Sequence, residues 1–198
     1  DAILTGAGTL RVTRRHRWTP WEPFPGDEPA FAALRAAEGR APLPILVVVS
    51  GSGALPADAA ALHVPGQPVI VATTRAGVAR AHATLASLPQ IAYHVSPGDS
   101  VDLSVLLRHL RHEHGVRSLL SEGGAQVYGQ LIASRLIDEV FTTISPIIVG
   151  NRSAPAAPRP SLVEGTAFDP NDPPRLRLVS LRRHGDFLFQ RARLNSAS

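Results

Sequence analysis

The sequence predicts an α/β fold with a mostly parallel central sheet, helices on both faces of that sheet and a C-terminal antiparallel hairpin. Short continuous apolar runs alternate with helical patterns over residues 2–136, as in parallel sheets that are buried on both faces. The segment "RLRLVSLRRHGDFLFQRARL" at 175–194 alternates apolar and polar residues around a Gly-Asp turn, which is typical of a hairpin. A length of 198 residues, 44% of them hydrophobic, suits one domain over residues 1–198.

Each element follows from a local pattern. The apolar, β-branched runs bounded by Gly, Pro or polar residues predict strands at 2–6, 45–50, 68–73, 91–96, 117–123 and 138–150. Apolar residues at helical spacing predict helices at 28–39, 75–88, 102–115 and 125–136. In the third of these helices Asp102 is the expected N-cap and Gly115 the expected stop. The proline-rich section 151–174 shows no periodicity and is expected to be a loop.

Composition excludes several classes of protein. The chain has no Cys, so it contains neither disulfides nor a Cys-based metal or redox site. No apolar run approaches the length of a membrane span, and we expect a cytoplasmic protein without a membrane partner. All 20 basic residues are Arg, but the net charge is only +4 and the charges are interleaved, so no nucleic-acid partner is expected. Because the sequence has no Met, we expect the encoded chain to begin upstream of Asp1.

Two clusters of side chains have competing interpretations. Arg11, Arg14, Arg15, His16 and Arg17 form either a phosphate-binding cluster or a solvated loop. His109 and His112 share one helix face, but they lie among charged residues, and a solvated face is the better interpretation. We therefore expect no metal site.

Four groups of residues follow predicted strands at their carboxyl ends, where open α/β sheets bind ligands. They are Gly6-Ala7-Gly8-Thr9, Ser50-Gly51-Ser52-Gly53, Thr73-Thr74-Arg75 and Ser121-Glu122-Gly123-Gly124. The first is not a complete dinucleotide fingerprint, because Arg11 stands where the third glycine belongs. Gln130 and Leu131 likewise exclude a P-loop after Gly124.

The Glu122-Gly123-Gly124 group is the most informative of the four. Two glycines let a backbone approach a ligand closely, and the helix that follows offers free N–H groups to a pyrophosphate. A carboxylate repels phosphate, so Glu122 either faces another polar ligand or caps a helix.

The segment "LLSEGGAQVYGQLIASRLIDEVFTTISPIIVG" at 119–150 resembles the C-terminal reductase domain of bifunctional riboflavin-biosynthesis proteins and the related stand-alone pyrimidine reductases. The residues that match the family pattern in order and spacing are Glu122, Gly123, Gly124, Asp138, Glu139, Pro146 and Gly150. "DAILTGAGT" at 1–9, "ILVVVSGSGALP" at 45–56 and "LVSLRRHGDFLFQRAR" at 178–193 also fit, so the resemblance covers nearly the whole chain.

The resemblance implies a dihydrofolate-reductase-like fold, NADPH as cofactor, a pyrimidine or pterin substrate and a homodimer. It implies a reaction in which the ribosyl group of a pyrimidine ribosylamine phosphate is reduced to a ribityl chain. The implied cofactor-binding residues are Gly6, Gly8, Thr9, Ser50, Thr73, Thr74, Gly123, Gly124, Ala125 and Val127. Glu122 is the implied catalytic residue beside the substrate, and Asp138-Glu139 is expected to be structural or interfacial. Arg75 follows the adenosine-side strand and is a candidate for the 2′-phosphate, or else a solvated arginine. Proteins of this fold also lead us to expect a cis peptide bond between Gly123 and Gly124.

This chain departs from the family in two places. The family usually places a substrate-contacting strand upstream of the position of Asp1, and we expect the single domain to lack this N-terminal strand. Where riboflavin enzymes typically read Ala-Asp-Asp-Pro after the glycine turn, this chain has Val12-Thr13-Arg14-Arg15. A reductase of another heterocycle, such as dihydrofolate, and a non-catalytic nucleotide- or flavin-binding protein on the same fold therefore remain alternatives.

Overall fold

The computed structural model describes residues 1–149 and 161–194, so Gly150 of the family motif lies outside the described residues. The chain forms two compact units, Asp1–Val127 and Tyr128–Ser198. The expectation of one domain over residues 1–198 stays a prediction. Within the described ranges, no helix has both the length and the apolar character needed to cross a membrane.

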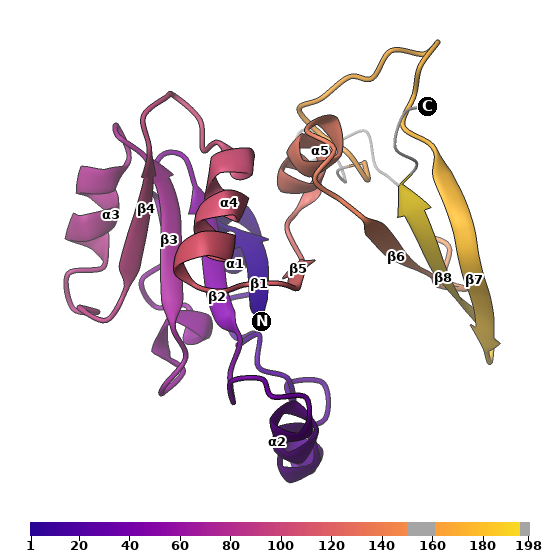
Figure 1. The fold of residues 1–198 in the computed structure, drawn as a ribbon, viewed down its shortest axis with the longest axis horizontal. Coiled ribbons are helices and arrows are strands. Elements are labelled where there is room, and N and C mark those ends of the chain that lie inside the picture. The colour runs from indigo at the N-terminus through magenta and orange to yellow at the C-terminus, as the bar shows by residue number, and fades with distance from the viewer. Residues whose placement is uncertain (150–160, 195–198) are drawn as a thin grey trace. The chain divides into compact units, whose positions relative to one another are not determined.

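The first unit is built on a parallel sheet of five strands in the order β4-β3-β2-β1-β5 (Figure 1). The strands are β1 (Ala2–Gly6), β2 (Ile45–Ser50), β3 (Val69–Thr74), β4 (Ala92–Ser96) and β5 (Leu119–Ser121). β1 to β4 begin and end within one residue of their predicted positions, and β5 is two residues shorter at each end than predicted. The continuous apolar runs are explained by burial, since every residue of the central strand β3 is buried. The predicted parallel sheet is thus confirmed.

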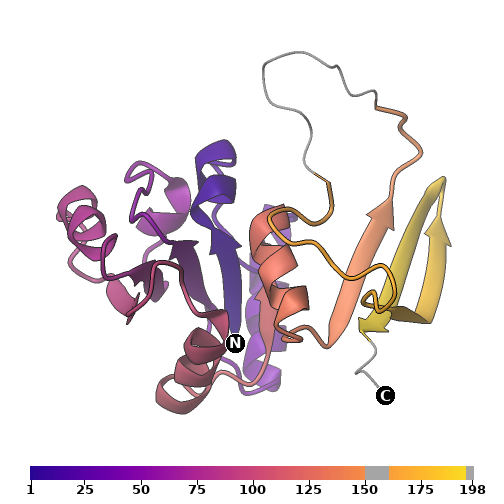
Figure 2. The same cartoon turned by 90° about the horizontal axis from the view of Figure 1, so that it is seen from above.

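Helices cover both faces of this sheet, as predicted. On one face the His82 ring of α3 (Val78–Thr84) stacks on Tyr93 of β4, with ring centroids 4.0 Å apart. The next residue of β4, His94, points to the other face because side chains alternate along a strand. There it meets His109 of α4 (Leu103–Glu113) at 4.8 Å. Figure 2 shows α4 and the short helix α1 (Ala7–Val12) on opposite faces of the sheet.

Local signals set the ends of α4. The Asp102 side chain accepts a hydrogen bond of 3.0 Å from the Val105 backbone N–H, which is the predicted N-cap. Gly115 has a φ of +63°, a conformation that favours glycine, and it follows the last turn as predicted. Three leucines at helical spacing, Leu103, Leu106 and Leu110, are buried.

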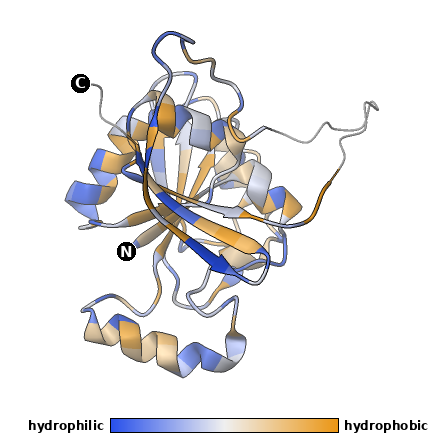
Figure 3. Cartoon of the chain, turned by 90° about the vertical axis from the view of Figure 1, so that its right-hand side faces the viewer, coloured by the Kyte–Doolittle hydropathy of each residue, from blue (hydrophilic) through white to orange (hydrophobic). Residues whose placement is uncertain are grey.

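The remaining helices of the first unit were predicted less completely. Helix α2 (Glu28–Ala37) matches its prediction but buries none of its residues, and hydrophobic and hydrophilic positions are interspersed along it in Figure 3. Three short helices have no predicted counterpart: α1 and the two 3-10 helices η1 (Pro25–Asp27) and η2 (Ala60–His63). All three have six residues or fewer, which is too short for a periodic pattern.

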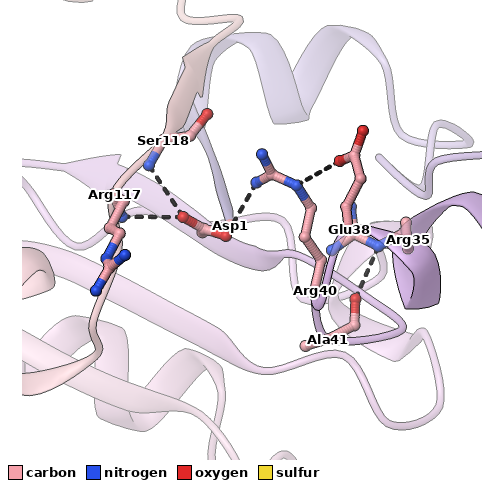
Figure 4. A network of polar contacts seen from close by, with 7 residues as sticks. All are labelled: Asp1, Arg35, Glu38, Arg40, Ala41, Arg117 and Ser118. Carbon is pink, nitrogen blue, oxygen red and sulfur yellow. Dashed lines mark hydrogen bonds and ion pairs between the residues drawn. The ribbon is translucent and has the colours of Figure 1, made fainter.

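The Asp1 carboxylate joins three segments at the amino ends of the strands (Figure 4). Its Oδ2 accepts hydrogen bonds from the backbone N–H groups of Arg117 and Ser118, at 2.9 and 3.0 Å, just before β5. Its Oδ1 accepts a bond of 3.0 Å from Arg40, which also binds Glu38 after α2. The carboxylate therefore fixes the start of β1 against the start of β5.

The second unit contains an antiparallel sheet in the order β6-β8-β7. Its strands are β6 (Glu139–Ile144), β7 (Leu176–His184) and β8 (Phe187–Leu194), and α5 (Ala125–Ala133) precedes them. The predicted hairpin is confirmed as β7 and β8, with Gly185 in its turn at a φ of +57°. One detail of the prediction was wrong, since the strand expected at 138–150 ends at Ile144. This strand, β6, pairs antiparallel with β8 of the hairpin.

Charge explains the register of β6 on β8. Glu139 lies opposite Arg193 and accepts two bonds from the neighbouring Arg191, at 2.7 and 2.8 Å, and one of 3.0 Å from Arg193. These hydrogen bonds, first that from Arg191 and then that from Arg193, lower the pKa of Glu139 from 4.5 to about 2. Glu139, one residue of the acidic pair at 138–139, thus has a structural role, as expected.

We predict that Glu139→Gln makes the protein less stable at neutral pH and flattens the acid dependence of its stability. Because folding lowers the pKa of Glu139, its contribution is present above pH 4.5 and is lost as the pH falls toward about 2. Thermal unfolding followed by circular dichroism across this range measures the effect. Glu113→Gln, at the exposed end of α4, is the matched control. Equal acid dependence in wild type and Glu139→Gln would contradict the prediction.

Candidate functional site

Two of the predicted groups come together at the carboxyl ends of β1 and β5: Gly6-Ala7-Gly8-Thr9 and Ser121-Glu122-Gly123-Gly124. These strands are parallel neighbours, with Leu4 in register with Ser121. The Glu122 backbone N–H continues the pairing by donating to the Leu4 carbonyl at 2.9 Å. The turn after Gly6 therefore lies beside the Glu122-Gly123-Gly124 turn.

The Val127 side chain packs between these two turns. A Cβ atom on Gly6 would lie 3.3 Å from Val127 Cγ2, and one on Gly123 would lie 2.7 Å from Val127 Cβ and Cγ1. The second distance is shorter than side chains tolerate, so Gly123 is required by packing. Val127 is 9% exposed, which makes it a packing residue beneath the turns.

The outer surface of the two turns carries little side-chain bulk. Gly8 and Gly124 are both exposed, and Ala125 opens α5 beside them. A Cβ on Gly124 would meet Thr9 Oγ1 at 3.3 Å, so Thr9 and Gly124 face each other across the two turns. A Cβ on Gly8 would meet only the Arg11 guanidinium, at 3.8 Å.

The other two predicted groups, which begin at Ser50 and Thr73, meet at the carboxyl ends of β2 and β3. Ser50 is in register with Thr73. All three candidate hydroxyl groups there are buried and bind the backbone. Ser50 Oγ donates to the Ala54 carbonyl at 3.3 Å, while Thr73 and Thr74 donate to the Gly51 carbonyl at 3.5 and 2.8 Å. These hydroxyls hold the shape of the turns.

Two arginines lie at the same ends of the strands. Arg75 follows β3 and is exposed, and its backbone N–H donates to the Ser96 carbonyl at 3.0 Å. Arg11 of α1 donates to the Ala54 carbonyl at 3.1 Å. Arg11 thus ties the turn after β1 to the turn after β2, which no sequence pattern indicated.

Glu122 has a partner that the sequence analysis missed. The residue is exposed, and its Oε2 accepts a hydrogen bond of 2.8 Å from Trp18 Nε1, 104 positions earlier in the chain. The only signal for this was a large aromatic residue at the end of an arginine-rich segment. The expected cis bond between Gly123 and Gly124 is wrong, since every described peptide bond is trans. For a non-proline bond the trans form is favoured by about 2.5–4 kcal/mol.

The two ambiguous clusters have different outcomes. In the arginine-rich segment Arg14 pairs with Asp58, while Arg15 and Arg17 are exposed, as in the solvated loop that was one of the two interpretations. The histidines that approach one another are His94, His109 and His114, with neighbouring ring centroids 4.8 and 5.3 Å apart. Over residues 1–149 and 161–194, no group of three His, Asp or Glu side chains has the geometry of a metal site.

Comparison with known proteins identifies the family. The model of the RibD C-terminal domain matches residues 1–188. The chain belongs to the RibD C-terminal domain family. The 2,5-diamino-6-ribosylamino-4(3H)-pyrimidinone 5′-phosphate reductase of Archaeoglobus fulgidus is 29% identical, and the match covers 98% of this chain and 80% of that protein. A protein of the same name from Aquifex aeolicus is 30% identical, over 85% of this chain and 64% of its own length.

Solved structures show the same fold. A pyrimidine reductase-like protein from Corynebacterium diphtheriae superposes with a TM-score of 0.74 at 23% identity, over all of this chain and 77% of that one. RibD from Acinetobacter baumannii gives a TM-score of 0.69 at 20% identity, with 98% of this chain covering 47% of that protein. The predicted fold class and the sequence resemblance are both confirmed.

We predict that Gly123→Ala lowers the free energy of unfolding by about 1–3 kcal/mol, because the added methyl group overpacks against Val127. Chemical denaturation measures the change. Gly98→Ala is the matched control, since Gly98 is exposed and its nearest neighbour lies 4.0 Å from the added Cβ. The double variant Gly123→Ala/Val127→Ala should lose less than the sum of the two single changes. Strict additivity would show that Val127 Cγ1, which Val127→Ala removes, does not contribute to the overpacking.

Proposed function

We propose that the chain is a reductase of riboflavin biosynthesis that uses a nicotinamide cofactor, NADPH, to reduce the ribosyl group of a ribosylaminopyrimidine 5′-phosphate. Its family membership and the names of its relatives from Archaeoglobus fulgidus and Aquifex aeolicus support the reaction class. The observation that carries the proposal for this chain is the position of Glu122. It stands beside two side-chain-poor turns at the carboxyl end of the sheet.

The residues at these turns fit a dinucleotide. Gly8 and Gly124 leave the outer surface of the turns free of side chains, so a pyrophosphate can approach the backbone. The first turn of α5 supplies N–H groups that are not used within the helix. Thr9 adds a hydroxyl group next to Gly124. When bound, a reduced nicotinamide supplies the hydride for the reduction.

Most of the other candidate residues act indirectly in this proposal, and Arg75 is the exception. Ser50, Thr73 and Thr74 hold the turns that receive the adenosine end, because their hydroxyls already bind backbone carbonyls. Val127 sets the spacing of the two glycine turns from below. The exposed guanidinium of Arg75 is the proposed contact of the 2′-phosphate.

Glu122 is the proposed contact of the substrate. Its Oε2 accepts a hydrogen bond from an indole N–H, a donor that carries no charge to offset that of the carboxylate. A pyrimidine presents ring N–H and amino donors, and charge-assisted hydrogen bonds to them orient the ring. A fixed ring holds the attached sugar carbon, C1 of the open imine form, in place for reduction.

The substrate heterocycle is the point at which a second candidate arises. The segment Val12-Thr13-Arg14-Arg15 lacks the acid that riboflavin enzymes typically have there, and Arg14 is paired with Asp58. The second candidate is therefore a reductase of another heterocycle, for which dihydrofolate is the test substrate. An assay of NADPH oxidation with each substrate also distinguishes the competing proposal, a binding protein without turnover.

The homodimer belongs to this proposal as well. The sheet of the second unit exposes large apolar side chains that a partner copy can cover. They include Phe141, Ile144, Leu178, Leu181 and Phe189. A cytoplasmic location is proposed from the family membership and the names of the relatives, which also support the biosynthetic role.

We predict that Gly124→Val abolishes NADPH binding, because its side chain fills the approach to the backbone beside Thr9. Isothermal titration calorimetry measures the affinity, and thermal unfolding confirms that the variant is folded. Gly98→Val is the matched control and should bind normally. As a second arm, Arg75→Ala should reduce the affinity for NADPH while leaving that for NADH unchanged. Unchanged NADPH affinity in a folded Gly124→Val variant would place the cofactor elsewhere.

We predict that Glu122→Gln lowers kcat/KM for the pyrimidine by about tenfold to a hundredfold, because charge-assisted bonds contribute about 1.5–3 kcal/mol. NADPH affinity should not change, since a carboxylate does not hold a pyrophosphate. The assay follows NADPH oxidation with the ribosylaminopyrimidine phosphate and then with dihydrofolate. Glu113→Gln is the control for the loss of one exposed carboxylate. Absence of turnover with either substrate in the wild type would refute the proposed function.

A further inference from the structure

Trp18 occupies an unusual position for a residue in a charged segment. It is 3% exposed, although Arg14, Arg15 and Arg17 beside it are exposed. Its φ is +54°, in the left-handed region that bulky residues rarely adopt. Such a conformation persists only where its surroundings enforce it, and it is found most often at functional sites.

Three contacts hold Trp18 in place. The buried amide of Gln67 donates to the Trp18 carbonyl at 3.4 Å and to the Pro44 carbonyl at 3.2 Å, which anchors the backbone to the segment before β2. The His16 ring lies edge-on to the indole, with ring centroids 4.5 Å apart. The indole also belongs to the buried apolar cluster that includes Leu10 and Leu46. The ring therefore has little freedom to turn.

The indole N–H of this fixed ring is directed at the Glu122 carboxylate, 2.8 Å away. Glu122 itself is exposed, so without this bond its side chain would sample several rotamers. Among the described residues, the indole is the only side chain that donates to this carboxylate. The hydrogen bond fixes the direction of the carboxylate. Because the indole donor has no charge, the charge of the carboxylate and its Oε1 remain free for another ligand.

We propose that Trp18 is a positioning residue: its indole N–H holds the Glu122 carboxylate in the orientation that binds the donor groups of the substrate heterocycle. This inference rests on the proposed function of Glu122. It adds a specificity determinant from the segment in which this chain departs from the riboflavin enzymes. Trp18 follows Val12-Thr13-Arg14-Arg15 closely in the chain. Its hydrogen bond to Glu122 connects that segment to the substrate end of the site.

Trp18→Phe tests the inference, since it keeps a buried aromatic ring and removes the N–H together with part of the indole's volume, an effect on packing that the Glu122→Ala background described below separates from the lost bond. We expect kcat/KM for the heterocycle to fall about tenfold, as for the loss of one hydrogen bond to a charged group, with NADPH affinity unchanged. Trp21→Phe is the matched control, because Trp21 is the other tryptophan of the chain and its indole donates no hydrogen bond among the described residues. It should leave turnover unchanged.

A Glu122→Ala background separates positioning from packing. If Trp18 acts through Glu122, Trp18→Phe causes no further loss of turnover in that background. The same tenfold loss in both backgrounds would show that Trp18 acts only through packing and would overturn the inference, as would unchanged turnover in Trp18→Phe alone.

A spectroscopic measurement is independent of turnover. The indole N–H resonance of Trp18, assigned with Trp21→Phe, should move upfield in Glu122→Ala when its acceptor is removed. An unchanged resonance means that the bond does not exist in solution, and the inference fails. If the resonance moves but the wild type reduces neither heterocycle, the bond stands, while the proposed function and the positioning role both fail.

Discussion

The packing of one side chain, Val127, between the turns that follow β1 and β5 determines the candidate site. Gly6 and Gly123 both lie against it, and at Gly123 there is no room for even a methyl group. Close packing of this kind transmits small changes, because protein interiors have few voids into which atoms can move. The positions of Thr9, Glu122 and Gly124 therefore depend on the volume of a residue that needs no contact with a ligand.

The opposite end of the same strand pair is fixed by charge. The Asp1 carboxylate accepts two backbone N–H groups before β5 and one arginine from the segment after α2. β5 has only three residues, so its ladder alone gives few hydrogen bonds to hold the register. A slip of one residue would turn Glu122 to the other face of the sheet. Apolar packing at one end and ionic hydrogen bonds at the other thus hold the register together.

The sequence was most informative where burial dictates pattern. β2 and β3 are continuous apolar runs because both of their faces are covered, and they were predicted to within one residue. The partner of β6 could not be predicted because a short apolar run does not reveal it; here the pairing with β8 is supported by Glu139 and two arginines of β8. The carboxyl-end rule found the turns of the site. It could not show that the hydroxyls of Ser50, Thr73 and Thr74 face the backbone, because that depends on turn geometry.

The partner of Glu122 could not be predicted for a further physical reason. In a segment with several arginines, sequence reasoning pairs a carboxylate with a guanidinium, and Arg14 does make such a pair, with Asp58. Glu122 instead binds an indole, a neutral donor that satisfies one oxygen without cancelling the charge. An arginine at that place would compete with the donors of a ligand for the same carboxylate, and breaking the ion pair would offset the new bonds. A site that must bind N–H groups with a carboxylate is therefore better served by tryptophan, whose bulk is accommodated in the apolar core beneath the loop.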